Sequence, residues 1–237
     1  MNVARLTALM AAAALTLAAC GGSDAPVVSD ADVTSEEVAG DPLPPIEAEP
    51  APVSMECPTG DSDAVVQSFP EAPPFCLESG ASYAAAVSTS LGDFTIDLDP
   101  VAAPTAVNSF VFLARNNYFD NTLCHRVIQQ FVVQCGDPTA TGTGGPGYSF
   151  VDELPAPGQY EIGSIAMANS GPNTNGSQFF IISGPSGAGL DPLYSLFGQI
   201  RADDLGVVSA MDAVGSVDSS GISSEDVVII DVSIIQS

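Results

Sequence analysis

The chain has 237 residues, 46% of them hydrophobic and 14% charged, which is enough for one or two domains with a packed core. Its charge is strongly negative, because 29 acidic residues stand against only four basic ones, all arginines, for a net charge of -25. Duplex DNA and RNA are therefore poor candidate partners, since binding them depends on cations that neutralise phosphates.

Residues 1–20 have the pattern of a signal peptide. A basic start at Arg5 precedes an apolar run, from Leu6 to Ala19, that is too short to span a membrane comfortably. The run closes in Leu17-Ala18-Ala19-Cys20, which resembles the cleavage site of bacterial lipoproteins and predicts Cys20 as the lipidated first residue. An ordinary secretory signal is the alternative. In both cases we expect an extracytoplasmic protein, and in the first case one that is lipid-anchored to the bacterial cell membrane or envelope.

Residues 21–80 are predicted to be an acidic, proline-rich linker. This zone has frequent prolines, scattered carboxylates and no basic residue. Such a composition cannot bury enough apolar surface to offset chain entropy, so we expect disordered or extended structure. The linker would act as a tether that holds the following domain, residues 81–237, away from the membrane.

Four cysteines remain once Cys20 is assigned to the anchor, namely Cys57, Cys76, Cys124 and Cys135. An even number outside the cytoplasm indicates disulfides, with three possible pairings. Cys124 and Cys135 flank a predicted hairpin that turns near Gln129-Gln130, where the simplest register sets them opposite each other, although a one-residue bulge would spoil that register. We therefore favour Cys124–Cys135 and Cys57–Cys76. A zinc site is the weaker alternative, because the chain has no C-x-x-C pair.

The predicted domain is rich in strands. Apolar and polar residues alternate from Phe94 to Leu98 and again from Val228 to Ile234, which is typical of strands. Between them, apolar residues at helical spacing predict a helix that begins at Pro104 and stops at Asn116-Asn117. A second helix is expected from Asp204 to Ala213. Many strands and two helices favour a mainly β barrel with helical caps.

Two segments carry the most specific signal. One contains His125-Arg126-Val127-Ile128 followed by residues 131–137, and the other is a run of small and amide residues, 167–180, that ends in Phe179-Phe180. In this order and at this separation they closely resemble the two signature segments of the cyclophilin family of peptidyl-prolyl cis–trans isomerases. The resemblance covers roughly residues 82–235. It implies a closed eight-stranded antiparallel β-barrel capped by two α-helices, with the active groove on the outer face because side chains fill the interior of small barrels.

The implied activity is rotation about an X–Pro peptide bond, which has a barrier of about 18–20 kcal/mol because of amide resonance. Lowering that barrier by about 7 kcal/mol would accelerate exchange roughly a hundred-thousand-fold. The chemistry needs a donor that draws the prolyl nitrogen lone pair out of resonance and an apolar pocket for the ring. It needs no cofactor and no metal.

The resemblance also implies roles for individual residues. Arg126 matches the catalytic arginine, whose planar, permanently charged fork suits donation to the prolyl nitrogen, and a structural ion pair is the alternative. Gln134 matches the glutamine that binds a substrate carbonyl and supports the arginine, and Phe131 matches a wall of the proline pocket. The other residues expected to bind substrate are Val132, Ala168, Asn169, Ser170, Gln178, Phe180, Leu190 and Tyr194. Taken singly, the apolar members of this set would be assigned to the core.

The chain departs from the family pattern at several positions, one of them Val132 in place of a frequent methionine. Tyr194 stands where many relatives have histidine, and its ring still supplies an apolar face and a donor. Gly189 stands where a tryptophan associated with cyclosporin binding is frequent, so we expect isomerase activity with weakened cyclosporin affinity. Cys135 replaces a common glycine, and a disulfide to Cys124 would lock the catalytic hairpin.

Two other features have simpler interpretations. Residues 142–147 formally fit G-x-G-x-x-G, but Pro146 and the absence of a following helix favour a glycine-rich loop beside the groove. His125 has no partnered nucleophile and is expected to be structural.

We therefore expect an isomerase, by default a monomer, that assists the folding of exported proteins and takes proline-containing polypeptides as substrates. A non-catalytic proline-peptide binding module or chaperone on the same fold is the alternative. A solute-binding lipoprotein is a third possibility, and it would require two α/β lobes.

Overall fold

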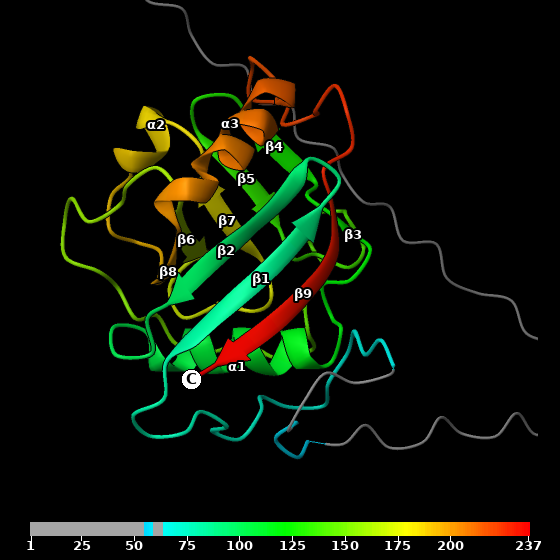
Figure 1. The fold of residues 1–237 in the computed structure, drawn as a ribbon, viewed down its shortest axis with the longest axis vertical. Coiled ribbons are helices and arrows are strands. Elements are labelled where there is room, and N and C mark those ends of the chain that lie inside the picture. Colours follow the sequence, from blue (N-terminus) through cyan, green and yellow to red (C-terminus); the bar gives the residue numbers. More distant parts are fainter. Residues whose placement is uncertain (1–54, 59–63) are drawn as a thin grey trace, which may run out of the picture. The chain divides into compact units, whose positions relative to one another are not determined.

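The computed structural model describes residues 55–58 and 64–237 (Figure 1). The predicted signal peptide, the lipidation site at Cys20 and most of the predicted linker lie outside these residues. The strands in the described part are β1 (Tyr83–Thr89), β2 (Gly92–Leu98), β3 (Thr122–Leu123), β4 (Arg126–Ile128), β5 (Val132–Cys135), β6 (Ser164–Met167), β7 (Phe179–Ile182), β8 (Leu196–Ile200) and β9 (Val228–Gln236). The helices are α1 (Pro104–Arg115), α2 (Pro185–Ala188) and α3 (Leu205–Val214), the last preceded by a 3₁₀ turn, η1 (Ala202–Asp204). None of these helices has the length and apolar character needed to cross a bilayer.

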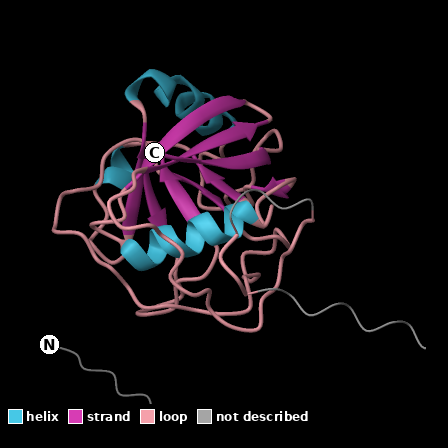
Figure 2. Cartoon of the chain, turned by 60° about the horizontal axis from the view of Figure 1, so that its bottom comes forward, coloured by secondary structure: helices cyan, strands magenta, loops and turns pink. Residues whose placement is uncertain are grey.

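All nine strands belong to one antiparallel sheet in the order β3-β9-β1-β2-β8-β6-β7-β5-β4. The sheet is strongly curled (Figure 2). Its two end strands, β3 and β4, are separated in the chain only by Cys124 and His125, so both ends of the sheet adjoin one segment of the chain. The expected mainly β, antiparallel architecture is confirmed. Nine strands replace the expected eight because the backbone leaves the ladder at Cys124-His125. In the described residues β3 and β4 do not pair with each other, so the sheet is curled without a continuous closing ladder.

Helices α1 and α3 cover opposite ends of the curled sheet (Figure 1). α1 begins at Pro104, which occupies the first turn where no backbone donor is needed, and it packs on β8 and β9. α3 contacts β2, β4 and β5, and its bounds agree with the helix expected from residue 204 to residue 213. α2 was not predicted, because one turn of small residues has no helical periodicity to detect.

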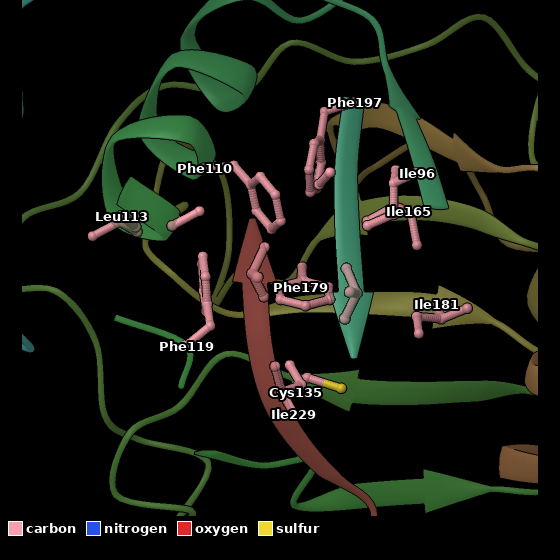
Figure 3. Close-up of a cluster of buried hydrophobic side chains, with 14 of the residues drawn as sticks. Ile96, Phe110, Leu113, Phe119, Cys135, Ile165, Phe179, Ile181, Phe197 and Ile229 are labelled. Carbon is pink, nitrogen blue, oxygen red and sulfur yellow. The ribbon is translucent and has the colours of Figure 1, made fainter. Parts of the chain in front are cut away.

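Aromatic rings fill the interior of the sheet. Phe110 of α1 packs against Phe119, Phe179 and Phe197, with ring centroids 5.0 to 5.6 Å apart (Figure 3). Ring pairs in such stacked and edge-on arrangements add to the stability that their burial provides. The interior is therefore a packed core, and any binding site must lie on the outer surface.

Strand β9 differs in one detail from its predicted alternation. Ile229 is buried, whereas Ile230, which the sequence pattern placed on the same face as Val228, is 47% exposed. The cause is a register shift against β1 between Ser88 and Thr89. Such a bulge moves later side chains to the other face, and a regular period of two cannot anticipate it.

Residues 64–80, which were assigned to the predicted linker, pack against the domain. Phe69 is only 2% exposed, its ring lies 5.0 Å from that of Phe112 in α1, and its N–H donates to the Pro146 carbonyl at 2.8 Å. The Cys76 N–H donates to Asn108 Oδ1 of the same helix at 2.6 Å. We call residues 64–80 the strap. The packed region therefore begins before residue 81, because the Phe69 ring and backbone bonds at Phe69 and Cys76 anchor a segment whose overall composition predicts no structure.

Both favoured disulfides are present, Cys57–Cys76 and Cys124–Cys135. The reason given for the second pair needs correction. Arg126 pairs with Gln134 in the β4–β5 hairpin, one residue out of the assumed register, so the ladder does not set the cysteines opposite each other. They meet because the chain leaves the ladder before β4, which brings the Cα atoms of Cys124 and Cys135 to 3.9 Å from each other.

Candidate active site

The β4–β5 hairpin places Arg126 and Gln134 side by side on the outer face of the sheet. The Arg126 Nη1 donates to Gln134 Oε1 at 3.5 Å, and the guanidinium carbon lies 5.5 Å from the centroid of the Phe131 ring. That distance is within the range of a cation–π contact. Both contacts hold the guanidinium at the rim of the apolar hollow described below, outside the packed interior.

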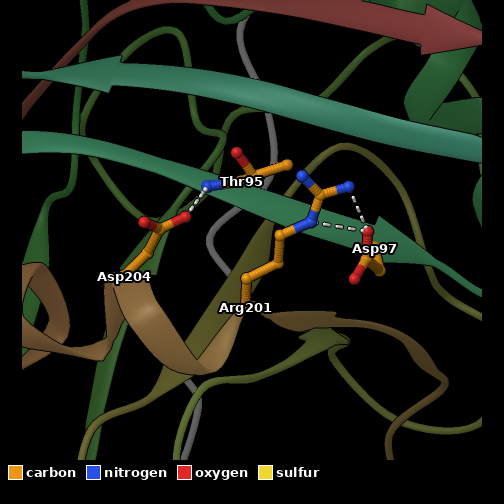
Figure 4. A network of polar contacts seen from close by, with 4 residues as sticks. All are labelled: Thr95, Asp97, Arg201 and Asp204. Atoms are coloured by element: carbon orange, nitrogen blue, oxygen red, sulfur yellow. Dashed lines mark hydrogen bonds and ion pairs between the residues drawn. The ribbon is translucent and has the colours of Figure 1, made fainter.

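Arg126 forms no ion pair with any other residue that the structure describes. By contrast, Arg201 donates through Nε and Nη2 to Asp97 Oδ1, at 3.0 and 2.8 Å, on the surface near β2 (Figure 4). The structural ion pair considered as the alternative role for Arg126 is therefore not observed. Arg126 lines the hollow, and no carboxylate of the described residues engages its guanidinium.

The loop after α3 supports the stem of Arg126. The Val127 N–H donates to the Gly221 carbonyl at 2.9 Å, and a Cβ at Gly221 would lie 2.6 Å from Arg126 Cγ. Gly221 also has a φ of +71°, which favours glycine. Only a residue without a side chain lets this loop lie flat against the arginine.

A hollow of about 110 Å³ opens beside the guanidinium, and we call it the proline pocket. Its lining residues are Arg126, Phe131, Val132, Gln134, Ala168, Asn169, Phe180, Leu190 and Tyr194, all of them in the predicted site. Strand alternation builds it: Val132 and Phe180 face outward, whereas Val133 and Phe179 face the core. The Gln134–Phe180 register between β5 and β7 then brings the polar and apolar walls together.

A second hollow of about 330 Å³ adjoins the first, and we call it the glycine-rich hollow. Residues 142–146, Tyr148, Ser170 and Gln178 line it, and it shares Gln134, Ala168 and Asn169 with the proline pocket. Ser170 and Gln178, which were predicted to bind substrate, therefore lie in this hollow and not in the proline pocket. Together the two hollows form one continuous groove.

Side-chain amides connect the groove walls. Gln178 Nε2 donates to the carbonyls of Gly142 and Gly144, at 3.1 and 2.9 Å, which leaves its Oε1 to accept from Gln134 Nε2 at 2.9 Å. Gln134 must then present its own Oε1 to Arg126. These hydrogen bonds start at the carbonyls of the glycine-rich loop. They fix the orientation of the Gln178 and Gln134 amides and, through Gln134, of the Arg126 guanidinium.

Sequence reasoning missed Asp137, which organises that loop. Its carboxylate is inaccessible to solvent and accepts backbone N–H groups from Thr139, Thr141, Gly142 and Gly144. Burial alone would raise the pKa of Asp137, but a hydrogen bond from the Thr139 hydroxyl at 2.7 Å, together with the backbone bonds, holds it below its ordinary value. A side chain at Gly144 would collide with the carboxylate, which explains a glycine there. An aspartate at a strand end, followed by threonines and glycines, was the available signal.

Tyr160 was also missed. It lies beneath the proline pocket, and its hydroxyl contacts the backbone of Tyr194. His125 lines neither hollow and packs against Gly142. Burial lowers the pKa of His125, so the imidazole is neutral at neutral pH, as suits a structural residue.

Residues 84–234 match the model of the family described as cyclophilin type peptidyl-prolyl cis-trans isomerase/CLD. The chain belongs to the cyclophilin family. Its cyclophilin domain is 42% identical over 156 residues to the probable peptidyl-prolyl cis-trans isomerase B of Mycobacterium leprae, a match that covers 60% of this chain and 52% of that protein. The peptidyl-prolyl cis-trans isomerase-like 1 of Neurospora crassa is 43% identical over 134 residues, 54% of this chain and 80% of that protein. The chain thus spans about half the length of its mycobacterial relatives.

Solved cyclophilins share the fold. A crystal structure of a Cryptosporidium parvum cyclophilin type peptidyl-prolyl cis-trans isomerase superposes with a TM-score of 0.60 at 34% identity, and the match covers 65% of this chain and 98% of that one. A second crystal structure of the same protein, in the presence of the dipeptide ala-pro, gives a TM-score of 0.59 with 64% and 98% covered. The strap lies outside the residues that match the family model.

Proposed function

We propose that this protein is a peptidyl-prolyl cis–trans isomerase that accelerates rotation about X–Pro bonds of exported polypeptides. The observation that carries the proposal is the position of the Arg126 guanidinium. It lines an apolar hollow, 5.5 Å from the Phe131 ring, and no carboxylate of the described residues pairs with it.

The geometry accounts for the chemistry. A prolyl ring seated against Phe131, Val132 and Phe180 would bring its nitrogen beneath the guanidinium. A donor at that nitrogen stabilises the twisted, pyramidal form more than the planar amide, so it binds the transition state selectively. Gln134, held by Gln178, orients the guanidinium in advance, which avoids reorganisation during the twist.

Proline-containing peptides are the proposed substrates. The Cryptosporidium relative was crystallised in the presence of the dipeptide ala-pro, which supports a short Ala-Pro peptide as a first probe. The groove continues past the proline pocket into the glycine-rich hollow, where a longer chain would lie in extended form. With Gly189 at the position where relatives often have tryptophan, cyclosporin binding is proposed to be weakened.

The decisive experiment compares wild type with Arg126→Ala in the full chain, using a peptide with one Ala-Pro bond. Loss of one transition-state donor is expected to lower kcat/KM roughly a hundred- to a thousand-fold. Peptide affinity should change far less. Arg201→Ala is the matched control, because it removes an exposed arginine away from the groove and should leave catalysis intact.

The alternative, a non-catalytic proline-peptide binding module, gives a different result in the same experiment. The wild type would then bind the peptide without accelerating its exchange, and Arg126→Ala would alter affinity alone. That outcome would overturn the isomerase proposal.

The proposed place of action is the outer side of a bacterial membrane, through a lipid on Cys20. The Leu17-Ala18-Ala19-Cys20 sequence, after an apolar run too short to span a membrane comfortably, supports it. Expression of wild type and Cys20→Ser in a bacterium tests it. Wild type should fractionate with membranes and Cys20→Ser should not, whereas equal release of both would contradict the anchor.

A further inference from the structure

The segment between α2 and β8, residues 189–195, carries two walls of the proline pocket, Leu190 and Tyr194. It has neither helical nor strand structure, and Leu193 beside Tyr194 is 58% exposed. A wall built on such a segment keeps its shape only if other parts of the chain hold the backbone in place.

At the end of the segment the Met167 N–H donates to the Ser195 carbonyl at 2.9 Å. At Tyr194 one hydroxyl supplies the support. Tyr160 Oη donates to the Tyr194 carbonyl at 2.6 Å and accepts from the Tyr194 N–H at 3.1 Å. Both backbone polar groups of a single residue are therefore bound by the same atom, as a neighbouring strand would bind them. Asn169 adds a third bond, from Nδ2 to the Leu193 carbonyl at 3.0 Å.

Fixing the backbone of Tyr194 also fixes its ring. The ring stands edge-on to Phe180, with centroids 5.2 Å apart and planes at 86°, and both rings line the proline pocket. Tyr160 lines neither hollow, is only 4% exposed, and packs under the pocket with Val132 and Phe180. Its hydroxyl therefore affects a bound peptide only through the backbone of Tyr194.

We infer that Tyr160 is a positioning residue, whose hydroxyl sets the aperture of the proline pocket by holding Tyr194 against Phe180. The inference rests on the proposed function, since it assigns this role to the same pocket. Burial raises the pKa of Tyr160 above its ordinary value of 10.0, so the hydroxyl keeps its proton throughout the neutral range.

Tyr160→Phe in the full chain tests the inference, because it retains the buried ring and removes only the hydroxyl. KM for an Ala-Pro peptide, and its Kd by calorimetry, should rise about three- to tenfold, the effect of losing one or two net hydrogen bonds. kcat should stay within about twofold, because Arg126 and Gln134 are untouched. Tyr83→Phe is the matched control: Tyr83 is buried and its hydroxyl accepts the Glu78 N–H at 2.7 Å on the strap side, so its loss should leave KM unchanged.

A double-mutant cycle shows whether the effect passes through Tyr194. In a Tyr194→Ala background, Tyr160→Phe should raise Kd no further, because the ring that it positions is gone. An equal additional rise, an unchanged Kd in the single variant, or a fall in kcat alone would each overturn the inference.

Two measurements test the role of Tyr160 separately from the behaviour of the variants and from the isomerase proposal. Slow amide exchange of Tyr194 in the wild type is expected, and exchange as fast as in an unstructured peptide would overturn the inference without any variant. If the wild type binds Ala-Pro peptides without isomerising them, the proposed function fails, while the Kd values still decide the role of Tyr160.

Discussion

The proline pocket and the glycine-rich hollow lie side by side but are built differently. The first is a small apolar recess on the outer faces of β5 and β7, whose inner faces form the core. The second is about three times larger and is walled by loop backbone and amides that depend on the buried carboxylate of Asp137. The shape of the pocket is thus tied to the stability of the domain, whereas the hollow can change without unfolding it.

The largest effect is expected from Phe180→Ala. Phe180 is 5% exposed and serves both the pocket and the packing beneath it, so its truncation should lower the free energy of unfolding by about 3–5 kcal/mol. Peptide binding should fall in parallel. Chemical denaturation and calorimetry measure the two quantities, and lost binding with unchanged stability would break the proposed link between pocket and core.

Asp137→Asn should weaken the glycine-rich hollow and leave the proline pocket intact. It weakens hydrogen bonds made to a charged acceptor, a loss of about 2 kcal/mol in the free energy of unfolding. A peptide long enough to reach the glycine-rich hollow should bind more weakly, while an Ala-Pro dipeptide should bind as before. Equal losses for both peptides would show that the hollow and the pocket are not independent.

The same carboxylate gives a pH dependence. Its folded pKa lies below the ordinary value, so its contribution to stability is present at neutral pH and is lost as the pH falls through that depressed value. Asp137→Asn should therefore flatten the acid limb of the stability profile. An unchanged slope below pH 4, about the ordinary pKa of an aspartate, would contradict the assignment.

A smaller effect, an increase in cyclosporin affinity, is expected from Gly189→Trp. Gly189 has a φ of -88°, and a Cβ there would meet only ordinary contacts, at 3.5 Å or more. The variant should fold normally and bind cyclosporin about tenfold more tightly, which is about 1.4 kcal/mol. Nanomolar inhibition of the wild type would show instead that the missing tryptophan is not what limits the drug.

The sequence predicted the residues whose roles follow from local sequence motifs. Every residue that lines the proline pocket was expected from the family resemblance, Arg126 and Phe131 within the signature segments and Leu190 and Tyr194 beyond them. Alternation predicted the strands near residues 94–98 and 228–234, and the resemblance implied their antiparallel arrangement. Tyr160 and Phe69 escaped detection, because each acts through a partner that the chain reaches only after folding. Tyr160 meets Tyr194 34 residues later, and Phe69 meets Pro146 across still more of the chain. Asp137 is different, because it binds residues two to seven positions later and its local signal was overlooked.

The bond between Cys57 and Cys76 closes a covalent ring at the entrance to the domain. A protease that cuts once inside this ring opens it but releases nothing, because the upstream piece remains attached through sulfur. Shedding the domain by a cut there requires a reductant as well. Proteolysis upstream of Cys57 needs no reductant. The ring therefore separates cuts that release the domain from the upstream chain from cuts that leave the two joined.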